Sequence, residues 1–219
     1  METTPFITTA VKPLTLEDSV GFAKELFDET SFSHLPIVKN NTLIGLISEE
    51  ELEEITEDDK ELGYFQYAFK FFHTDENGNL IELLSLFSEN NTNLIPVLNS
   101  ESNYIGYFEI QDILDVYADT PFLKNEGFVV LLEKESFDYS MSQLCQIVES
   151  EKGMILGIFI AEINATTTKI ALKISSKEIN ELLQSFRRYN YQVLSNHKED
   201  FFMEELKERS NYLQKYLNI

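Results

Sequence analysis

The sequence has 219 residues, of which 43% are hydrophobic and 25% charged, the composition of a folded globular protein rather than a disordered one. Its net charge of −21 is concentrated in the first half. Residues 1–120 carry five lysines, no arginine and 24 acidic residues, a net charge of −19, whereas residues 121–219 have a net charge of −2. This charge repels nucleic acid and anionic membrane surfaces, so we expect neither as a partner.

The compartment is indicated by what the sequence lacks. No apolar run approaches the roughly 20 residues that cross a bilayer. The first residues have neither the basic nor the apolar region of a signal peptide. The single cysteine, Cys145, excludes an internal disulfide and fits a reducing environment. We therefore expect a cytoplasmic protein.

The first half contains an internal repeat, in which residues 32–52 align with residues 93–113. Pro36 aligns with Pro96, and Gly45 aligns with Gly106. In each copy a β-branched run follows the proline and stops at an Asn-rich turn, and a second apolar run passes through the glycine into a helix. The pattern predicts a strand, a hairpin turn, a second strand and a helix.

An amphipathic helix is predicted before each hairpin. Its apolar face is formed by Val20, Ala23, Leu26 and Phe27 in the first copy and by Leu80, Leu83, Leu84 and Phe87 in the second. Residues 16–19 and 74–77 are rich in capping residues and acids, and we expect the helices to begin there. One copy is thus β-α-β-β-α, which is too thin to bury its own sheet. We therefore expect a tandem pair over residues 1–120, with copies at about 5–56 and 65–118.

The pattern changes after Gly127. Strands are predicted at 128–132, 154–163, 169–174 and 191–194, and helices at 141–148 and 176–189. The order β-α-β-β-α-β is that of a ferredoxin-like domain, which we place at residues 125–197 and which gives the chain an α+β fold. Residues 198–219 are predicted to form a terminal helix whose apolar stripe docks on another domain or on a second subunit, so we expect a homodimer.

The strand–helix junctions of the two copies support a resemblance. Gly45 to Glu51 and Gly106 to Asp112 are similar to the Gly-x-x-(Ser/Thr)-x-x-Asp element of CBS domains. With its ACT-like tail, the whole chain resembles the CBS–ACT proteins of the acetoin-utilisation family. The resemblance implies clefts that bind adenosine-containing ligands such as AMP, ATP with magnesium, or S-adenosylmethionine. In such clefts the hydroxyl contacts phosphate and the acid contacts the ribose hydroxyls.

Each copy departs from the family pattern. The first keeps Ser48 but has Glu51 in place of Asp, and these two residues fit either a ligand site or a simple capping box. The second keeps Asp112, which fits either a ribose contact or a solvated first-turn acid, but has Glu109 where the hydroxyl belongs. Glu109 would oppose a phosphate. The other candidate ligand contacts are His34, before the first strand's proline, and the backbone from Asn93 to Ile95.

The ACT-like half also departs from its family. The loop after its first strand, residues 135–140, has no glycine to allow close approach of a ligand to the backbone. Amino-acid binding through Asp138 and Gly153 is one interpretation, and an association surface is the other.

The sequence contains no catalytic constellation. The three histidines stand apart, and metal-binding, phosphate-loop and nucleophile motifs are absent from the sequence. Cys145 falls on a predicted apolar helix stripe, which favours an inert thiol. We therefore predict a non-catalytic sensor without a metal site, acting on an unknown protein target. The alternative is a ligand-free interaction module whose CBS clefts have degenerated.

Overall fold

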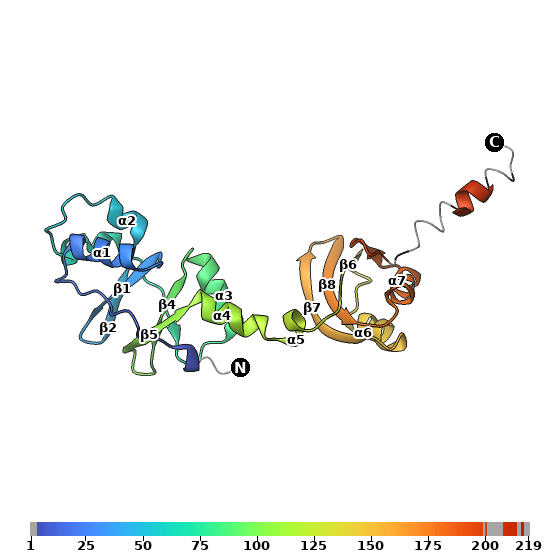
Figure 1. The fold of residues 1–219 in the computed structure, drawn as a ribbon, viewed down its shortest axis with the longest axis horizontal. Coiled ribbons are helices and arrows are strands. Elements are labelled where there is room, and N and C mark those ends of the chain that lie inside the picture. The colour runs from blue at the N-terminus through green and yellow to red at the C-terminus, as the bar shows by residue number, and fades with distance from the viewer. Residues whose placement is uncertain (1–3, 199, 201–207, 214–215, 217–219) are drawn as a thin grey trace. The chain divides into compact units, whose positions relative to one another are not determined.

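The computed structural model describes residues 4–198, 200, 208–213 and 216. The chain divides into two compact units, residues 1–118 and residues 119–219 (Figure 1). The helices and strands fit the predicted α+β fold. Within the described ranges, no helix has the length and apolarity needed to cross a membrane. The predicted helix at 198–219 falls largely on positions outside those ranges.

The first unit holds both repeats. The first repeat comprises α1 (Val20–Glu29), β1 (His34–Lys39), β2 (Thr42–Ser48) and α2 (Glu49–Glu53). The second comprises β3 (Thr74–Asp75), α3 (Leu80–Glu89), β4 (Leu94–Leu98), β5 (Tyr104–Glu109) and α4 (Ile110–Ala118). Short 3-10 helices, η1 (Thr4–Phe6) and η2 (Leu62–Ala68), lie before the respective repeats.

The order β-α-β-β-α is complete only in the second repeat. There β3 runs parallel to β4, with Thr74 opposite Val97. In the first repeat the same place is taken by a single parallel bridge between Leu14 and Ile37. Each repeat otherwise has the predicted antiparallel hairpin, β1–β2 or β4–β5.

The start of α3 differs from the sequence-based expectation. The segment 74–77 was expected to begin the helix, but it forms β3 and a turn, and Asn79 is the N-cap. The Asn79 side chain accepts hydrogen bonds from the backbone N–H groups of Ile81 and Glu82. Asn79 supplies the cap because β-pairing to β4 already holds Thr74 and Asp75 in extended conformation.

The two repeats exchange the segments that precede them. Lys70, which precedes the second repeat, pairs with Leu46 on β2 of the first, through N–O distances of 2.8 and 2.9 Å. Thr8, which precedes the first repeat, pairs with Tyr107 on β5 of the second, at 2.9 and 3.0 Å. The unit is therefore pseudo-symmetric, and each repeat is completed by a segment attached to the other.

This exchange explains the repeated glycines. A Cβ atom on Gly45 would lie 2.9 Å from Phe69 Cβ and 3.0 Å from the Lys70 carbonyl oxygen. A Cβ atom on Gly106 would lie 2.5 Å from the Thr8 carbonyl oxygen, and Gly106 has a φ of +146°. Each glycine therefore lets the exchanged segment cross its strand closely.

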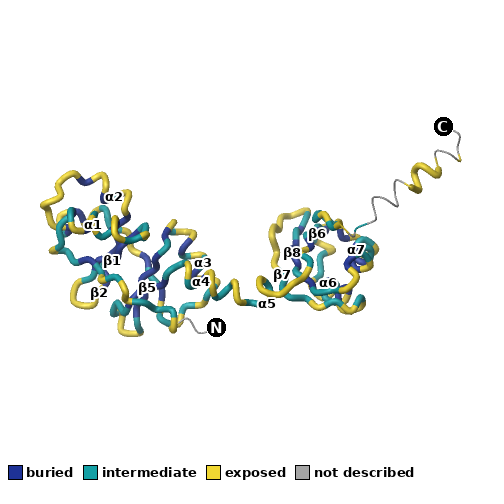
Figure 2. The backbone as a smooth tube through the Cα atoms, viewed as in Figure 1, coloured by how far each residue is buried: buried dark blue, intermediate teal, exposed yellow. Residues whose placement is uncertain are grey.

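The second unit contains α5 (Pro121–Lys124), β6 (Phe128–Glu135), α6 (Met141–Ser150), β7 (Met154–Ile163), β8 (Thr167–Ser175), α7 (Ile179–Arg188) and β9 (Gln192–Val193). Its sheet has the order β7-β8-β6-β9, and every neighbouring pair is antiparallel. The core cluster joins the buried residues of α6 and α7 to one face of β6 and β8 (Figure 2). Cys145 on α6 is only partly buried, because the buried stripe of this helix runs through Leu144, Ile147 and Val148.

Candidate ligand-binding site

One face of the β1–β2 hairpin gathers the polar groups of the first repeat. Residues directly opposite each other in an antiparallel pair share a face. His34 is opposite Ser48, Pro36 is opposite Leu46, and Lys70 is opposite Leu46 on its other side. We call this set of residues (His34, Pro36, Leu46, Ser48 and Lys70) the His34 face. The alternate residues Leu35 and Ile47 belong to the core on the other side of the hairpin.

His34 is held in a neutral, partly unsatisfied state. Its side chain is only 3% exposed, and its ring packs edge-on to Phe72 with the centroids 5.6 Å apart. Nδ1 lies 3.0 Å from Ser33 Oγ, whereas the buried Nε2 has no hydrogen-bond partner among the described residues. Burial, and to a smaller extent the positive charge of Lys70, lowers the pKa of His34 to about 4. A buried ring nitrogen without a partner is costly, so a polar group placed against Nε2 would be stabilised.

Ser48 lies opposite His34 and serves as the N-cap of α2. Its Oγ accepts a hydrogen bond from the backbone N–H of Glu51 at 3.2 Å, and the residue is 5% exposed. Ser48 therefore caps α2. The cap uses the Ser48 hydroxyl as an acceptor and leaves its proton available for a further acceptor, so capping and ligand contact are compatible. Glu51 lies in the first turn of α2, beside this cap.

Lys70 is the member of this face that the sequence did not reveal. It was missed because its segment forms a single bridge and carries no strand pattern. The available signal was the repeat itself, since Thr8 and Lys70 each precede a repeat, 28 and 26 residues before the aligned prolines, and make corresponding bridges. Three of the five lysines of residues 1–120 form ion pairs: Lys24 with Asp58, Lys39 with Glu17 and Lys60 with Glu57. Lys70 forms none with the described residues.

The second repeat has different side chains at the equivalent positions. We call Leu94, Pro96, Tyr107, Glu109 and Thr8 the Leu94 face, because Leu94 is opposite Glu109 and Pro96 is opposite Tyr107. Burial and the nearby charge of Asp112 raise the pKa of Glu109. Burial is also the main cause that raises the pKa of Tyr107, whose hydroxyl accepts from the Val11 N–H at 3.2 Å. Glu109 and Asp112 are therefore close enough to interact, on a face that is otherwise apolar or weakly polar.

Asn93 and Ile95 are engaged by the fold. The Asn93 side chain accepts from Ser33 N–H at 2.9 Å and donates to the Ser31 carbonyl oxygen at 2.6 Å. Its own carbonyl oxygen accepts from Ile110 N–H at 3.1 Å. Ile95 is fully buried in the core cluster, opposite Phe108 rather than on the Leu94 face. The structure thus brings together His34 and Ser48, and separately Glu109 and Asp112, but leaves Asn93 and Ile95 to packing.

The two candidate residues of the second unit are not brought together. Asp138 precedes α6 and pairs with the buried Lys134 at 3.0 Å, whereas Gly153 follows α6. The ten-residue α6, about 15 Å long, lies between them. Gly153 is needed for packing, because a Cβ atom there would lie 2.9 Å from Val148 Cγ1.

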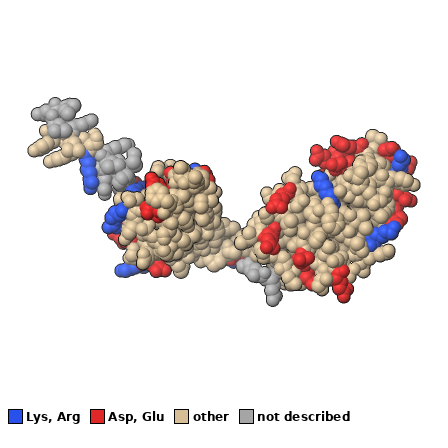
Figure 3. Space-filling view, turned by 180° about the vertical axis from the view of Figure 1, so that it is seen from behind, with Lys and Arg blue, Asp and Glu red and all other residues tan. Residues whose placement is uncertain are grey.

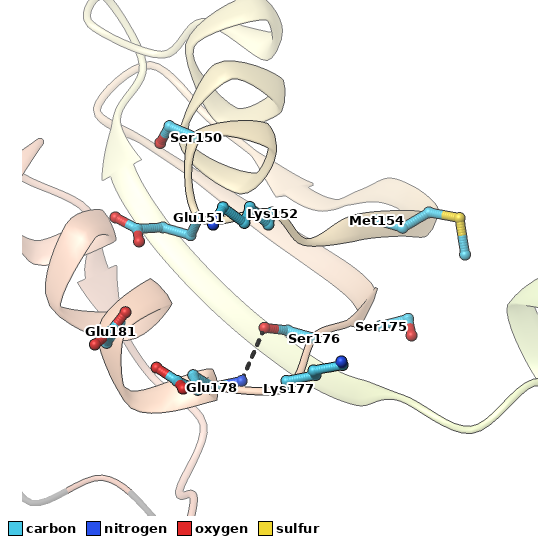
Figure 4. Close-up of a pocket in the computed structure, with 9 residues that line it drawn as sticks. All are labelled: Ser150, Glu151, Lys152, Met154, Ser175, Ser176, Lys177, Glu178 and Glu181. Carbon is cyan, nitrogen blue, oxygen red and sulfur yellow. Dashed lines mark hydrogen bonds between the residues drawn. The ribbon is translucent and has the colours of Figure 1, made fainter.

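A cavity of about 760 Å³ lies beside Gly153, between the end of α6, the start of β7 and the β8–α7 loop (Figure 4). Its lining carries charges of both signs, Lys152 and Lys177 against Glu151, Glu178 and Glu181. The hydroxyl of Ser176 accepts from the Glu178 N–H at 3.2 Å, the bond drawn in Figure 4. Neither Asp138 nor Gly153 lines this cavity.

The surface charge of the first unit follows the sequence. On the face drawn in Figure 3, Asp and Glu side chains dominate this unit, and Lys and Arg are few. No group of three or more His, Cys, Asp or Glu residues that could hold a metal occurs within the described part of the chain.

Comparison with known proteins places the repeat in a family. Residues 5–56 and 70–119 match the model of the CBS domain. An uncharacterized protein of Methanocaldococcus jannaschii, MJ0188, is 21% identical over 143 residues, which cover 61% of this chain and 54% of that protein. The chain thus spans about half the length of this curated relative.

Two solved structures are similar to part of this chain. A CBS domain pair/ACT domain protein of Thermotoga maritima, TM0892, is 16% identical and superimposes with a TM-score of 0.48, covering 54% of this chain and 98% of that chain. CBSX2, described in complex with AMP, is 18% identical with a TM-score of 0.44, covering 53% of this chain and 95% of that chain. The two matched segments coincide with the two repeats, so the first unit carries a tandem pair of CBS domains.

Proposed function

We propose that this chain is a non-catalytic regulatory protein whose CBS pair binds an adenosine-containing ligand at the His34 face. The observation that carries the proposal is the buried Nε2 of His34, which has no partner among the described residues and lies on the same face as Ser48. A ligand hydroxyl, amide or phosphate oxygen at this place satisfies the imidazole and also accepts from the Ser48 hydroxyl. Glu51, in the first turn of α2, is the acid available for the ribose hydroxyls, as Asp112 is on the other repeat.

The second unit, in this proposal, is an ACT-like domain over residues 125–197 that associates with a second copy. Its β7 is an edge strand of ten residues, and most of its side chains are exposed or half-buried. Phe159 is 51% exposed and Ile163 is 65% exposed. Long apolar edge strands are covered by pairing in stable proteins, and two antiparallel copies of one strand are related by a two-fold axis. The proposal includes membership of the acetoin-utilisation CBS–ACT proteins and a cytoplasmic location.

The ligand is tested by isothermal titration calorimetry on the full chain. The panel contains AMP, the ligand of CBSX2, together with ADP, ATP and S-adenosylmethionine, each with and without magnesium. We expect saturable binding of at least one member. His34→Leu, which installs the residue found at the same place in the second repeat, is expected to weaken that binding while the protein stays folded. Absence of any binding at millimolar ligand would contradict the proposal.

A second candidate function is that of a ligand-free interaction module. The observation that favours it is the pairing of Leu94 with Glu109 on the second repeat. An alkyl group and a carboxylate there replace the imidazole of His34 and the hydroxyl of Ser48. Light scattering of the full chain separates the two functions when it is combined with the ligand panel. A stable homodimer that ignores every ligand supports the interaction module, and a ligand-dependent change in mass or melting temperature supports the sensor.

A further inference from the structure

The two repeats provide an internal comparison of their faces, position by position. Where the first repeat has His34, Ser48 and Lys70, the second has Leu94, Glu109 and Thr8. Every one of these differences makes the first face more favourable to an anion, because a neutral imidazole, a hydroxyl and an ammonium replace an alkyl group, a carboxylate and a hydroxyl.

The charge of Lys70 is not compensated within the described residues. Lys24, Lys39 and Lys60 each lie within 3.4 Å of a carboxylate oxygen, whereas Lys70 has no such partner in the described part of the chain. The Lys70 backbone is fixed to β2 by two hydrogen bonds with Leu46. Its charge also reaches His34, since it is one of the two causes of the shifted pKa there. A fixed backbone and an uncompensated ammonium on the same face as an unsatisfied imidazole make an incomplete anion site.

We propose that Lys70 makes the His34 face selective for a phosphorylated nucleoside, while Glu109 excludes phosphate from the Leu94 face, so that one chain binds one nucleotide. The proposal rests on the proposed function and adds the discrimination between nucleotide and nucleoside. Lys70 belongs to the segment exchanged from the other repeat, so both repeats contribute to one site.

The electrostatic contribution is expected to be modest but measurable. Lys70 is exposed, so its attraction to a phosphate at contact distance is screened by water. We expect AMP to bind about tenfold more tightly than adenosine, with a preference that decreases as salt is added.

The test is calorimetry of AMP and adenosine on the full chain and its variants. Lys70→Met is expected to remove most of the preference for AMP and to leave adenosine affinity within about twofold. Lys12→Met is the matched control, since Lys12 is the other lysine of the first half without a described ion pair and is not among the causes of the shifted pKa of His34. Lys70→Arg keeps the charge and is expected to keep the preference, which separates charge from folding.

Each outcome bears on the proposal. Equal binding of AMP and adenosine to the unaltered chain, or a preference that survives in Lys70→Met, overturns the role of Lys70 and leaves the proposed function standing. Two AMP molecules bound per chain overturn the exclusion by Glu109. Binding of neither adenosine nor AMP overturns this proposal, and the proposed function falls with it only when the other members of the ligand panel fail to bind as well.

Discussion

Ser33 and Asn93 hold the two CBS domains together by a reciprocal pair of hydrogen bonds. They occupy equivalent positions 60 residues apart, and each backbone N–H donates to the other's side chain: Ser33 N–H to Asn93 Oδ1 at 2.9 Å and Asn93 N–H to Ser33 Oγ at 3.2 Å. Ser33 Oγ also contacts Nδ1 of His34 at 3.0 Å. The junction between the domains is therefore connected directly to the candidate ligand group.

We predict that Asn93→Ala lowers the free energy of unfolding of the first unit by about 1–3 kcal/mol, because it leaves the half-buried Ser33 N–H and the Ser31 carbonyl oxygen without this partner. Urea denaturation measures the change. Asn103→Ala, which removes a side-chain bond to the exposed Glu101, is the control and is expected to cost less than about 0.5 kcal/mol. Equal losses of stability in the two variants would show that the hydrogen bonds of Asn93 across the junction do not stabilise the first unit.

The pKa of His34 predicts a specific dependence of stability on pH. The pKa is about 4 in the folded chain against 6.5 for the free side chain, so the unfolded chain binds more protons between these values. The contribution of His34 is complete above pH 6.5 and is lost as the pH falls toward 4, by up to about 3 kcal/mol. Denaturation of the unaltered chain and of His34→Leu at several pH values checks this. The difference between the two should grow in that window, and parallel curves would contradict the assignment.

Gly106 is predicted to resist substitution. Gly106→Ala places a Cβ atom against the Thr8 carbonyl oxygen at a φ of +146°, so we expect a loss of about 2–4 kcal/mol and a loosened amino-terminal segment. Gly21→Ala is the control, because its Cβ meets only ordinary contacts at 3.4 Å and α1 gains helix propensity. Thermal unfolding of both variants decides the matter. A harmless Gly106→Ala would mean that the exchanged segment does not lie where the structure places it.

The Leu94 face is predicted to become an anion site when it is given the groups of the His34 face. In the triple variant Thr8→Lys, Leu94→His and Glu109→Ser, we expect the number of AMP molecules bound per chain to rise from one to two. Calorimetric stoichiometry is the measurement. The triple variant with Thr8→Met in place of Thr8→Lys is the control, and an unchanged stoichiometry in the full triple variant would show that other parts of the second domain block the ligand.

Most elements of the fold could be predicted because the repeat aligned from its proline to its junction acid and each predicted helix had a clear apolar face. The exchange of segments could not be predicted, because Thr8 and Lys70 form single bridges that leave no periodic pattern in the sequence. The missing first strand of the first repeat and the Asn79 cap have the same origin, since pairing between distant segments decides them.

Part of the candidate site follows from the sequence. Ser48 stands in the Gly-x-x-Ser-x-x-Glu element and His34 precedes the first strand's proline, and the register of β1 and β2 puts the two residues opposite each other. The role of Lys70 depends on a contact between segments that are far apart along the chain. The engagement of Asn93 by Ser33 and Ser31 depends on such contacts as well, so no local pattern could have revealed it.

The exchange of segments between the repeats has a consequence for how the two sites can differ. In a dimer of identical single domains, any substitution appears at both sites at once, and the symmetry keeps the sites alike. Because both domains lie on one chain in this protein, Thr8 and Lys70 are independent positions, and so are Ser48 and Glu109. One face can therefore lose its polar groups while the other keeps them, so a single chain can carry two different faces on one pseudo-symmetric structure.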